Sequence, residues 1–365
     1  MTTNFSAVPI LDYSQLVSPE TRPEFISQLL NALTNVGFFY LSNTPVLNSD
    51  ITDKIIDYAP KFFDLPEEEK ERIRMVHSPH FFGYSRFGAE LTKGKVDQRE
   101  QFDIGTPREE RGWKPGDPEF LRLWGPSQWP KEELLPGFKD TFTSYVQQTQ
   151  KLGEEILAVV AEALHLPPGA FSPFIEEGGN QDRAKIVKYP VPEDETSDQG
   201  VGPHYDGGLL TLLVQASPHR GLQVQNLSGE WIDAPPISRT YIVNIGKALE
   251  TVTQKVCIAT SHRVLSPAKG STPRYSIPFF QMISQRTTIG KSVLDLPPEI
   301  LQLKEKRGNV GSSDSVNYAE YNELPAGQVA LIGRVKSHPD VAERHYPELF
   351  KQYFPDGLPS HGSAY

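Results

Sequence analysis

The stretch that decides the fold and the site runs from Val201 to Gln215 and reads VGPHYDGGLLTLLVQ. Its second half is rich in Leu, Thr and Val, a composition that predicts a buried strand. Residues two apart in a strand point to the same face. We therefore expect His204 and Asp206 to direct a ring nitrogen and a carboxylate toward one point, while Tyr205 turns away.

A second stretch adds a third candidate ligand and a cation. It begins at His262, passes through a turn that contains Pro and Gly, and continues as a predicted strand that starts at Arg274. Arg274 and Ser276 are again two residues apart and share one face of that strand. Two His and one carboxylate that leave coordination positions open form the facial triad of non-haem Fe(II) oxygenases. These residue types make His204, Asp206 and His262 candidate metal ligands and catalytic residues.

The His-x-Asp pattern is common by itself, and the chain contains a second copy, His338-Pro339-Asp340. Pro followed by acidic residues is typical of a helix start. A helix start has no strand face on which two such residues would meet, so we expect His338 to be structural. His204 differs because Gly and Pro precede it and a predicted strand follows it.

Together these motifs resemble the isopenicillin-N-synthase-like family of 2-oxoglutarate- and Fe(II)-dependent dioxygenases. The pattern of that family runs His-x-Asp, Leu-Thr-x-Leu, Gly-Leu-Gln, Trp, Asn-x-Gly, His-Arg-Val and Arg-x-Ser. The resemblance covers most of the chain. The chain carries each motif in this order, at residues 204–206, 210–213, 221–223, 231, 244–246, 262–264 and 274–276.

The resemblance implies a mainly β fold with flanking helices, of the α+β class. Its core is expected to be a double-stranded β-helix, or jelly roll, with an N-terminal helical region and a long packing helix. Short strands separated by Gly, Pro and Asn turns agree with this core. We expect one catalytic unit, residues 1–365. Within it we expect an N-terminal dioxygenase region at 7–120, an Fe(II)- and 2-oxoglutarate-binding jelly-roll core at 180–285, and a C-terminal cap at 286–365.

Apolar periodicity locates the main helices. Residues 23–36 and 142–163 carry apolar side chains in steps of three and four, which predicts amphipathic helices. The second stripe suits packing against the main sheet, and a coiled-coil partner is the alternative. A last helix is predicted from Pro339 to Phe350.

The resemblance also assigns the co-substrate site. The distal carboxylate of 2-oxoglutarate needs a cation, and Arg274 offers a planar fork that binds a carboxylate at two points. Ser276 adds a hydroxyl donor. Tyr189 matches a tyrosine that relatives direct to the co-substrate, with a packed core tyrosine as the alternative. The cofactors implied are Fe(II), 2-oxoglutarate and O2, with ascorbate as a reductant in vitro.

The segment between residues 83 and 103 resembles the family region that folds over the mouth of the site. We expect substrate contacts from Tyr84, Arg86 and Phe102, and also from Phe280. His77 and His80 fall in a polar loop and are expected at the surface.

Composition excludes several partners. The net charge is −10, with 36 Lys and Arg against 46 Asp and Glu, and the basic residues form no block, so we expect no nucleic acid partner. We expect no membrane partner either, because no apolar run approaches the roughly 18 residues that span a bilayer. The N-terminus has no signal-peptide pattern. A single cysteine, Cys257, fits a reducing compartment, so a cytoplasmic location and a buried, unreactive thiol are expected.

Three functions remain open on these grounds. The first is a 2-oxoglutarate-dependent oxygenase that hydroxylates, desaturates or cyclises a small organic molecule in specialised metabolism and releases succinate and CO2. The second is an Fe(II) oxidase of the same fold that does not use 2-oxoglutarate. The third is a Zn-binding hydrolase or a non-catalytic binding module. The residues do not identify the substrate or the oligomeric state.

Overall fold

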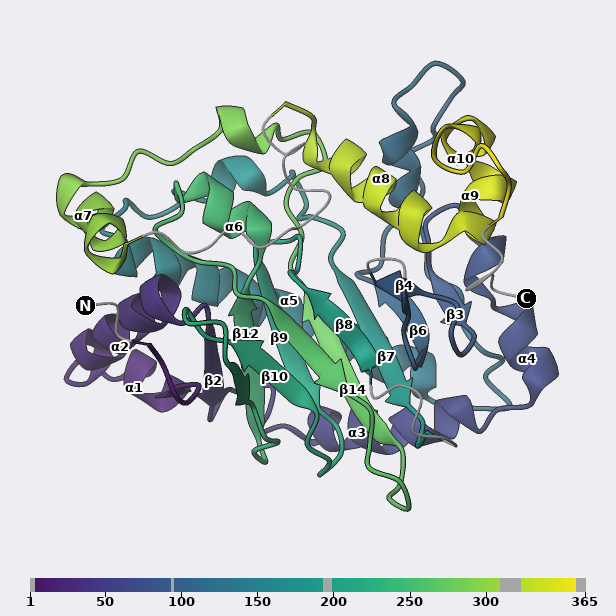
Figure 1. Ribbon diagram of the computed structural model, residues 1–365, viewed down its shortest axis with the longest axis horizontal. Coiled ribbons are helices and arrows are strands. Elements are labelled where there is room, and N and C mark those ends of the chain that lie inside the picture. Colours follow the sequence, from purple (N-terminus) through teal and green to yellow (C-terminus); the bar gives the residue numbers. More distant parts are fainter. Residues whose placement is uncertain (1–3, 93–94, 193–198, 309–322, 359–365) are drawn as a thin grey trace.

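The strands of the protein form two principal sheets and one small hairpin in this computed structural model, which describes residues 4–92, 95–192, 199–308 and 323–358 (Figure 1). The strands are β1 Ile10–Asp12, β2 Phe38–Ser42, β3 Gly83–Ser85, β4 Leu91–Thr92, β5 Lys95–Val96, β6 Glu100–Gly105, β7 Arg183–Tyr189, β8 Gln199–His204, β9 Leu210–Gln215, β10 Leu222–Gln225, β11 Trp231–Asp233, β12 Thr240–Ile245, β13 His262–Leu265 and β14 Arg274–Phe280. The larger sheet has eight strands in the order β1-β2-β12-β9-β14-β7-β6-β3, and the smaller has four in the order β11-β10-β13-β8. Strands β4 and β5 pair separately.

The two principal sheets pack against each other through apolar side chains. Val201 and Val264 of the small sheet lie in one buried cluster with Val187 and Ile242 of the large sheet. Because side chains alternate between the faces of a strand, each sheet can turn one apolar face toward the other. This arrangement confirms the predicted jelly-roll core.

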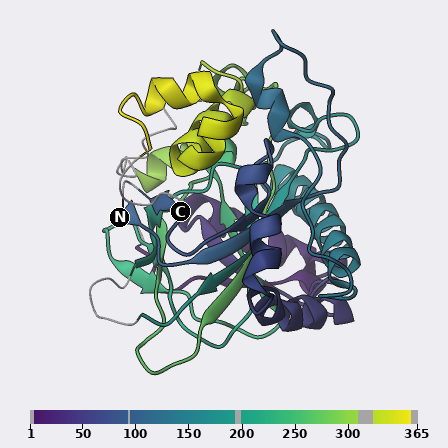
Figure 2. The same cartoon turned by 90° about the vertical axis from the view of Figure 1, so that its right-hand side faces the viewer.

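Helices cover the outer face of the large sheet. The helices that precede the core are α1 Tyr13–Val17, α2 Arg22–Asn35, α3 Asp50–Phe63, α4 Glu67–Arg72 and α5 Phe138–Ala163. The α5 residues Phe142 and Ile156 are buried in the same apolar cluster as Leu212 and Phe279 of the sheet. The predicted stripe of α5 therefore packs on the sheet, and Figure 2 shows this group of helices beside the strands.

Helix α6 Lys247–Val252 lies between β12 and β13 in the chain, and the helices after the core are α7 Pro298–Arg307, α8 Ala326–Ser337, α9 Pro339–His345 and α10 Pro347–Tyr353. Helices α8 to α10 lie over one end of the sheets, whereas α7 lies beside α2 (Figure 1). Helices α8, α9 and α10 are joined to the preceding loops by a separate apolar cluster that includes Phe81, Leu331 and Tyr346. Residues 309–322 and 359–365 of the predicted cap lie outside the described residues. Short 3-10 helices occur at Met75–His77, Glu119–Leu123, Ser172–Phe174 and Ile289–Lys291.

Two sequence-based expectations are corrected here. The single helix predicted from Pro339 to Phe350 is two helices, because Pro347 has no N–H to continue the first and instead begins the second. His77 is exposed as expected, but His80 is buried. The Nδ1 atom of His80 lies 2.6 Å from the carbonyl oxygen of Arg122, so the polar loop that contains it folds inward.

None of the described helices combines the length and the apolarity needed to cross a bilayer.

Candidate active site

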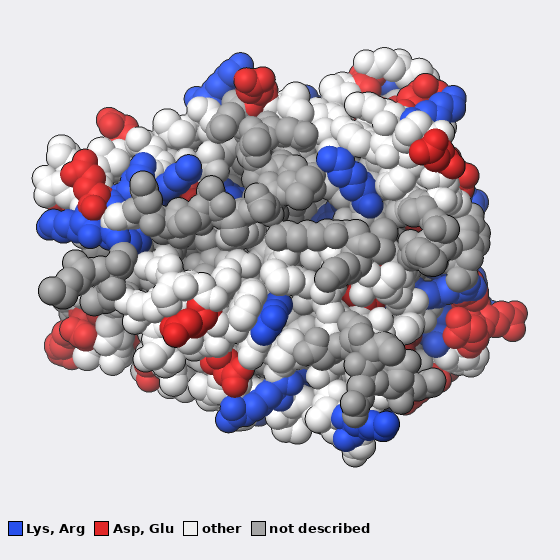
Figure 3. Space-filling model, in the orientation of Figure 1, with Lys and Arg blue, Asp and Glu red and all other residues white. Residues whose placement is uncertain are grey.

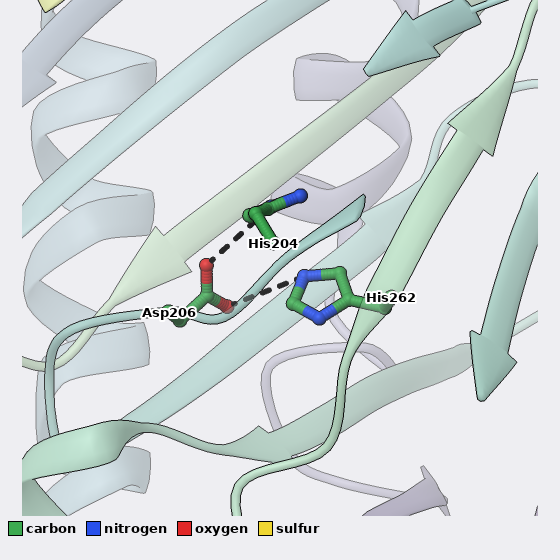
Figure 4. A group of neighbouring side chains, drawn as sticks. All are labelled: His204, Asp206 and His262. Carbon is green, nitrogen blue, oxygen red and sulfur yellow. Dashed lines mark ion pairs between the residues drawn. The ribbon is translucent and has the colours of Figure 1, made fainter. Parts of the chain in front are cut away.

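His204 and Asp206, two residues apart, meet the distant His262 at the edge of the small sheet (Figure 4). One ligand atom from each of His204, Asp206 and His262 lies within 4.8 Å of the others. The Nε2 atom of His204 is 3.9 Å from Oδ1 of Asp206, and Nε2 of His262 is 3.8 Å from Oδ2. This spacing and donor set suit a single metal ion.

Strand pairing places the two imidazoles together. In the antiparallel pair β8–β13, His262 lies directly opposite His204, and side chains of paired residues project from the same face. The ring centroids are 4.2 Å apart. The pairing therefore fixes the relative position of two of the three candidate ligands.

Asp206 reaches the site in another way than the sequence predicts. Strand β8 ends at His204, so Asp206 lies beyond the strand in the connection to β9. The backbone N–H of Lys247 donates to the Asp206 carbonyl oxygen over 2.8 Å. Gly208 and Gly246 pass so close that a Cβ on Gly246 would collide with the Gly208 backbone. This close approach of two chain segments requires glycine and holds the Asp206 connection in place.

Two buried side chains orient the Asp206 carboxylate. Its Oδ2 atom accepts hydrogen bonds from Thr211 Oγ1 at 2.6 Å and from Asn244 Nδ2 at 2.8 Å. The sequence motifs contain both residues, but their spacing along the chain indicates no role for either. The available signal was their polarity, because both interrupt otherwise apolar strands.

Hydrogen bonding to the backbone orients both imidazoles. The Nδ1 atom of His204 lies 2.8 Å from the Gly202 carbonyl oxygen, and Nδ1 of His262 lies 3.2 Å from that of Thr260. When Nδ1 carries the proton, Nε2 presents its lone pair to the site. Burial lowers the pKa of His204, and burial together with the adjacent His204 lowers the pKa of His262 to about 4. Both rings are therefore neutral near pH 7, the form that binds a metal.

The Asp206 carboxylate is ionised in the same environment. Burial by itself raises the pKa of Asp206, but His262, His204 and the two hydrogen-bond donors outweigh burial and lower the pKa below its usual value. The site therefore combines two neutral nitrogen ligands with one anionic oxygen ligand.

The guanidinium of Arg274, the first residue of β14 in the large sheet, is buried. Arg274 is 1% exposed, and its Nη2 donates to Gln215 Oε1 at 3.2 Å. Its Nε and Nη1 atoms have no hydrogen-bond partner among the described residues. The guanidinium lies 4.9 Å from the ring centroid of Tyr189, its register partner on β7. Two unpaired buried N–H donors are costly in an apolar interior, so this geometry suits an absent anionic ligand.

One cavity of about 920 Å³ connects these groups. It is bounded by β7, β8, β13 and β14 and by residues of α8, and it also reaches Glu90, Thr92 and Arg99. The predicted site residues that line it are His204, Asp206, His262, Arg274, Ser276, Tyr189 and Phe280.

The other predicted substrate contacts do not line the cavity. The Tyr84 hydroxyl donates to Glu100 over 2.7 Å, and Phe102 lies in the apolar cluster beneath the helices. Arg86 donates to Glu71 over 2.6 Å. Glu90, Thr92 and Arg99 of the same chain region line the cavity, whereas Tyr84, Arg86 and Phe102 do not.

His338 lies where the helix-start prediction places it, at the junction of α8 and α9. It is not part of the three-residue cluster. It does line the cavity, and its Nε2 atom is 3.7 Å from Oε1 of Glu90.

Comparison with known proteins identifies the family. Residues 181–283 match the 2OG-Fe(II) oxygenase superfamily, and residues 8–132 match the family described as non-haem dioxygenase in morphine synthesis, N-terminal. The 2-oxoglutarate-dependent dioxygenase frbJ of Dothideomycetidae sp. (strain 11243) is 43% identical over 95% of this chain and 94% of its own length. Homoarginine-6-hydroxylase 2-ODD-233 of Oryza sativa subsp. japonica is 33% identical over 88% of this chain and 97% of its own.

A solved structure supports the same assignment. A full-length Neurospora crassa protein, crystallised in complex with alpha-KG and thymine, aligns with a TM-score of 0.68 and 26% identity, over 89% of this chain and 96% of that chain. These matches confirm the resemblance stated from the motifs. The chain belongs to the 2-oxoglutarate- and Fe(II)-dependent oxygenase superfamily and is an oxidoreductase that requires Fe(II) and 2-oxoglutarate.

Proposed function

We propose that His204, Asp206 and His262 hold the Fe(II), and that Arg274, Ser276 and Tyr189 bind the 2-oxoglutarate. The observation that carries this assignment is the unpaired guanidinium of Arg274 in the same cavity as the three candidate ligands. Three ligands on one side of a metal leave positions for a chelating co-substrate and for oxygen.

The roles of the protein groups follow from their contacts. Thr211 and Asn244 fix the Asp206 carboxylate, because both donate to one of its oxygens. Arg274 supplies the fork for the distal carboxylate, and Ser276 lies two residues along the same strand to add a hydroxyl. When bound, iron and 2-oxoglutarate supply the oxidising power that activates a carbon–hydrogen bond of the substrate. Helix α8 covers the cavity and limits the access of water.

The substrate is a small organic molecule. A volume of about 920 Å³ is at the upper end of the range for small-molecule pockets. One relative is named a homoarginine-6-hydroxylase, and one solved neighbour binds thymine. We propose that this chain likewise oxidises a small polar molecule, by hydroxylation, desaturation or ring closure, in specialised metabolism. On the face shown in Figure 3, basic and acidic groups are interspersed, an arrangement that favours a small-molecule substrate over nucleic acid.

We also propose a cytoplasmic location. It rests on Cys257, a free and buried thiol whose pKa is raised by burial to about 12, so that it is chemically inert. A fluorescent fusion of the full chain, viewed in cells, tests the location.

Succinate formation tests the proposed function. The purified protein with Fe(II), ascorbate and 2-oxoglutarate is expected to release succinate, slowly alone and faster with substrate. His262→Ala is expected to abolish the release, while Arg263→Gln, a change on the adjacent residue outside the cavity, leaves it intact. Unchanged release by His262→Ala would remove the assignment of the ligands. A second candidate, an oxidase independent of 2-oxoglutarate, has no observation in its favour here.

A further inference from the structure

Strand register separates two cationic regions of the cavity. In the pair β7–β14, Arg274 lies opposite Tyr189, and Phe280 lies opposite Arg183. Arg274 and Phe280 are six positions apart on one strand, so the two ends of this pair are about 20 Å apart. One 2-oxoglutarate molecule cannot span that distance. The charges near Arg183 therefore belong to another part of the cavity.

Two cations at that end are already balanced by carboxylates. Arg99 donates to Glu90 over 2.6 Å. The Nζ atom of Lys185 lies 3.7 Å from Glu90 and 3.5 Å from Asp103. Arg99 also lies 3.1 Å from Asp97. Three carboxylates thus surround these two cations, and each cation already has a direct anionic partner.

Arg183 has hydrogen-bond acceptors for its guanidinium but no directly paired carboxylate among the described residues. Its Nη atoms donate to the carbonyl oxygens of His80, Phe81 and Leu123 at 2.7, 3.1 and 3.3 Å. The described residues place no carboxylate within 4.0 Å of it. Burial, and then the nearby Arg334, lower the pKa of Arg183 well below its usual value. Neutral carbonyl groups hold the side chain in position, and the Phe82 ring lies 4.3 Å from the guanidinium carbon. Asp103 attracts the charge only at longer range, so no carboxylate pairs with Arg183 directly.

Arg334 projects into the cavity from α8 without a polar partner. Across the described chain, no hydrogen bond or ion pair involves its guanidinium, and its one aromatic contact is the Phe81 ring, 6.0 Å from the guanidinium carbon. Asp103 and Glu90 act on it only through longer-range attraction. A guanidinium fork that faces a cavity and lacks a counter-ion is suited to bind a carboxylate or phosphate at two points.

We propose that the substrate carries an anionic oxygen group, a carboxylate or a phosphate, and that Arg334 of α8 binds it with support from the charge of Arg183. This inference rests on the proposed function, because it uses the same cavity. Phe280 lies opposite both Arg183 and Thr211, and Thr211 contacts Asp206. The two arginines therefore bind the substrate from the side of the candidate metal ligands that is remote from Arg274.

Matched pairs of probes test the proposal. The pairs are L-homoarginine with its decarboxylated amine, 3-phenylpropionate with 3-phenylpropanol, and thymidine 5′-monophosphate with thymidine. Binding to the anaerobic Fe(II) protein saturated with 2-oxoglutarate is measured by calorimetry. In at least one pair, the anionic member is expected to bind about tenfold more tightly than its partner or better, since charge-assisted pairs exceed neutral ones. Preference within a carboxylate pair or within the phosphate pair identifies which anion is used.

Variants localise the effect. Arg334→Gln is expected to remove the preference for the anion, Arg334→Lys to restore part of it, and Arg344→Gln, an exposed change on α9 outside the cavity, to have no effect. Equal binding within every pair, failure of all anionic probes to bind, or an unchanged preference in Arg334→Gln would overturn the proposal. Binding of 2-oxoglutarate, followed in the same samples, separates the two failures. If the wild type does not bind 2-oxoglutarate, the proposed function is contradicted. If it binds 2-oxoglutarate but shows no preference for anions, only the role of Arg334 is contradicted.

Discussion

Asn244 lies directly opposite Thr211 in the antiparallel pair β9–β12, and both side chains donate to the same carboxylate oxygen of Asp206. The large sheet thus orients a candidate ligand that lies outside any strand. Residues of this kind, one step removed from a metal, commonly change its affinity 10–100-fold, a rough general range.

Asn244→Ala is expected to weaken metal binding by about that factor without unfolding the protein, because Thr211 still holds the carboxylate. Mn(II) titration of the apoprotein measures the affinity. Asn35→Ala, a half-buried position at the C-terminal end of α2 and outside the cavity, is the matched control. Equal Mn(II) affinity in Asn244→Ala and the wild type would show that Asp206 does not depend on this hydrogen bond.

Arg274→Gln is expected to raise the KM for 2-oxoglutarate by about 100-fold or more, because a carboxylate would be left without its charged partner. Arg274→Met is expected to leave the unliganded protein as stable as the wild type or more stable, since it removes a buried and partly unpaired charge. Steady-state kinetics and urea unfolding measure the two effects. Loss of stability in Arg274→Met would indicate that the arginine is structural.

Glu90→Gln is expected to destabilise the protein by about 3–5 kcal/mol, because Arg99 and Lys185 would lose a buried counter-ion. The exposed pair of Glu162 with Arg22 offers a control, in which Glu162→Gln should cost about 1 kcal/mol or less. Free energies of unfolding in urea provide the comparison. Similar costs for the two variants would mean that the cluster around Glu90 is screened by solvent.

Asp182 is expected to make stability depend on pH. Its carboxylate accepts from the Met282 backbone N–H and from Gln150 Nε2, each over 2.7 Å, and burial raises its pKa to about 7. Between about pH 4 and 7 the folded state holds a proton that the unfolded state has released. This contribution to stability is therefore lost as the pH rises, at up to about 1.4 kcal/mol per unit.

Asp182→Asn removes the titrating group, so the difference in unfolding free energy between the wild type and the variant should change across this window. Urea unfolding of both proteins at several pH values measures it, and other titrating groups cancel in the comparison. A difference that is constant with pH would show that Asp182 stays ionised.

The motifs predicted those features that depend on local order along the chain. His204, His262 and Arg274 follow from spacing and strand periodicity, and the jelly roll follows from the family resemblance. The sheet face that a side chain occupies, and the residue that it contacts, depend on packing between distant segments. In β6, Asp103 pairs in register with Lys185, which lines the cavity, whereas its neighbour Phe102 packs in the apolar cluster beneath the helices. The sequence resemblance located this strand without specifying which of its faces meets the cavity.

For the same reason, the motifs did not predict that Glu90 and Arg334 lie at the cavity. They belong to segments far apart in the sequence, a hairpin region and a C-terminal helix, which meet only through the fold. Neither segment carries a motif, and a single arginine on a helix is most often exposed to solvent.

The absorption spectrum of the anaerobic Fe(II) protein with 2-oxoglutarate tests the central claim most directly. We expect a visible charge-transfer band in the wild type and in Arg263→Gln, no band in His262→Ala, and a band in Arg274→Gln only at much higher 2-oxoglutarate concentration. A band of full intensity in His262→Ala at the wild-type concentration would contradict the account.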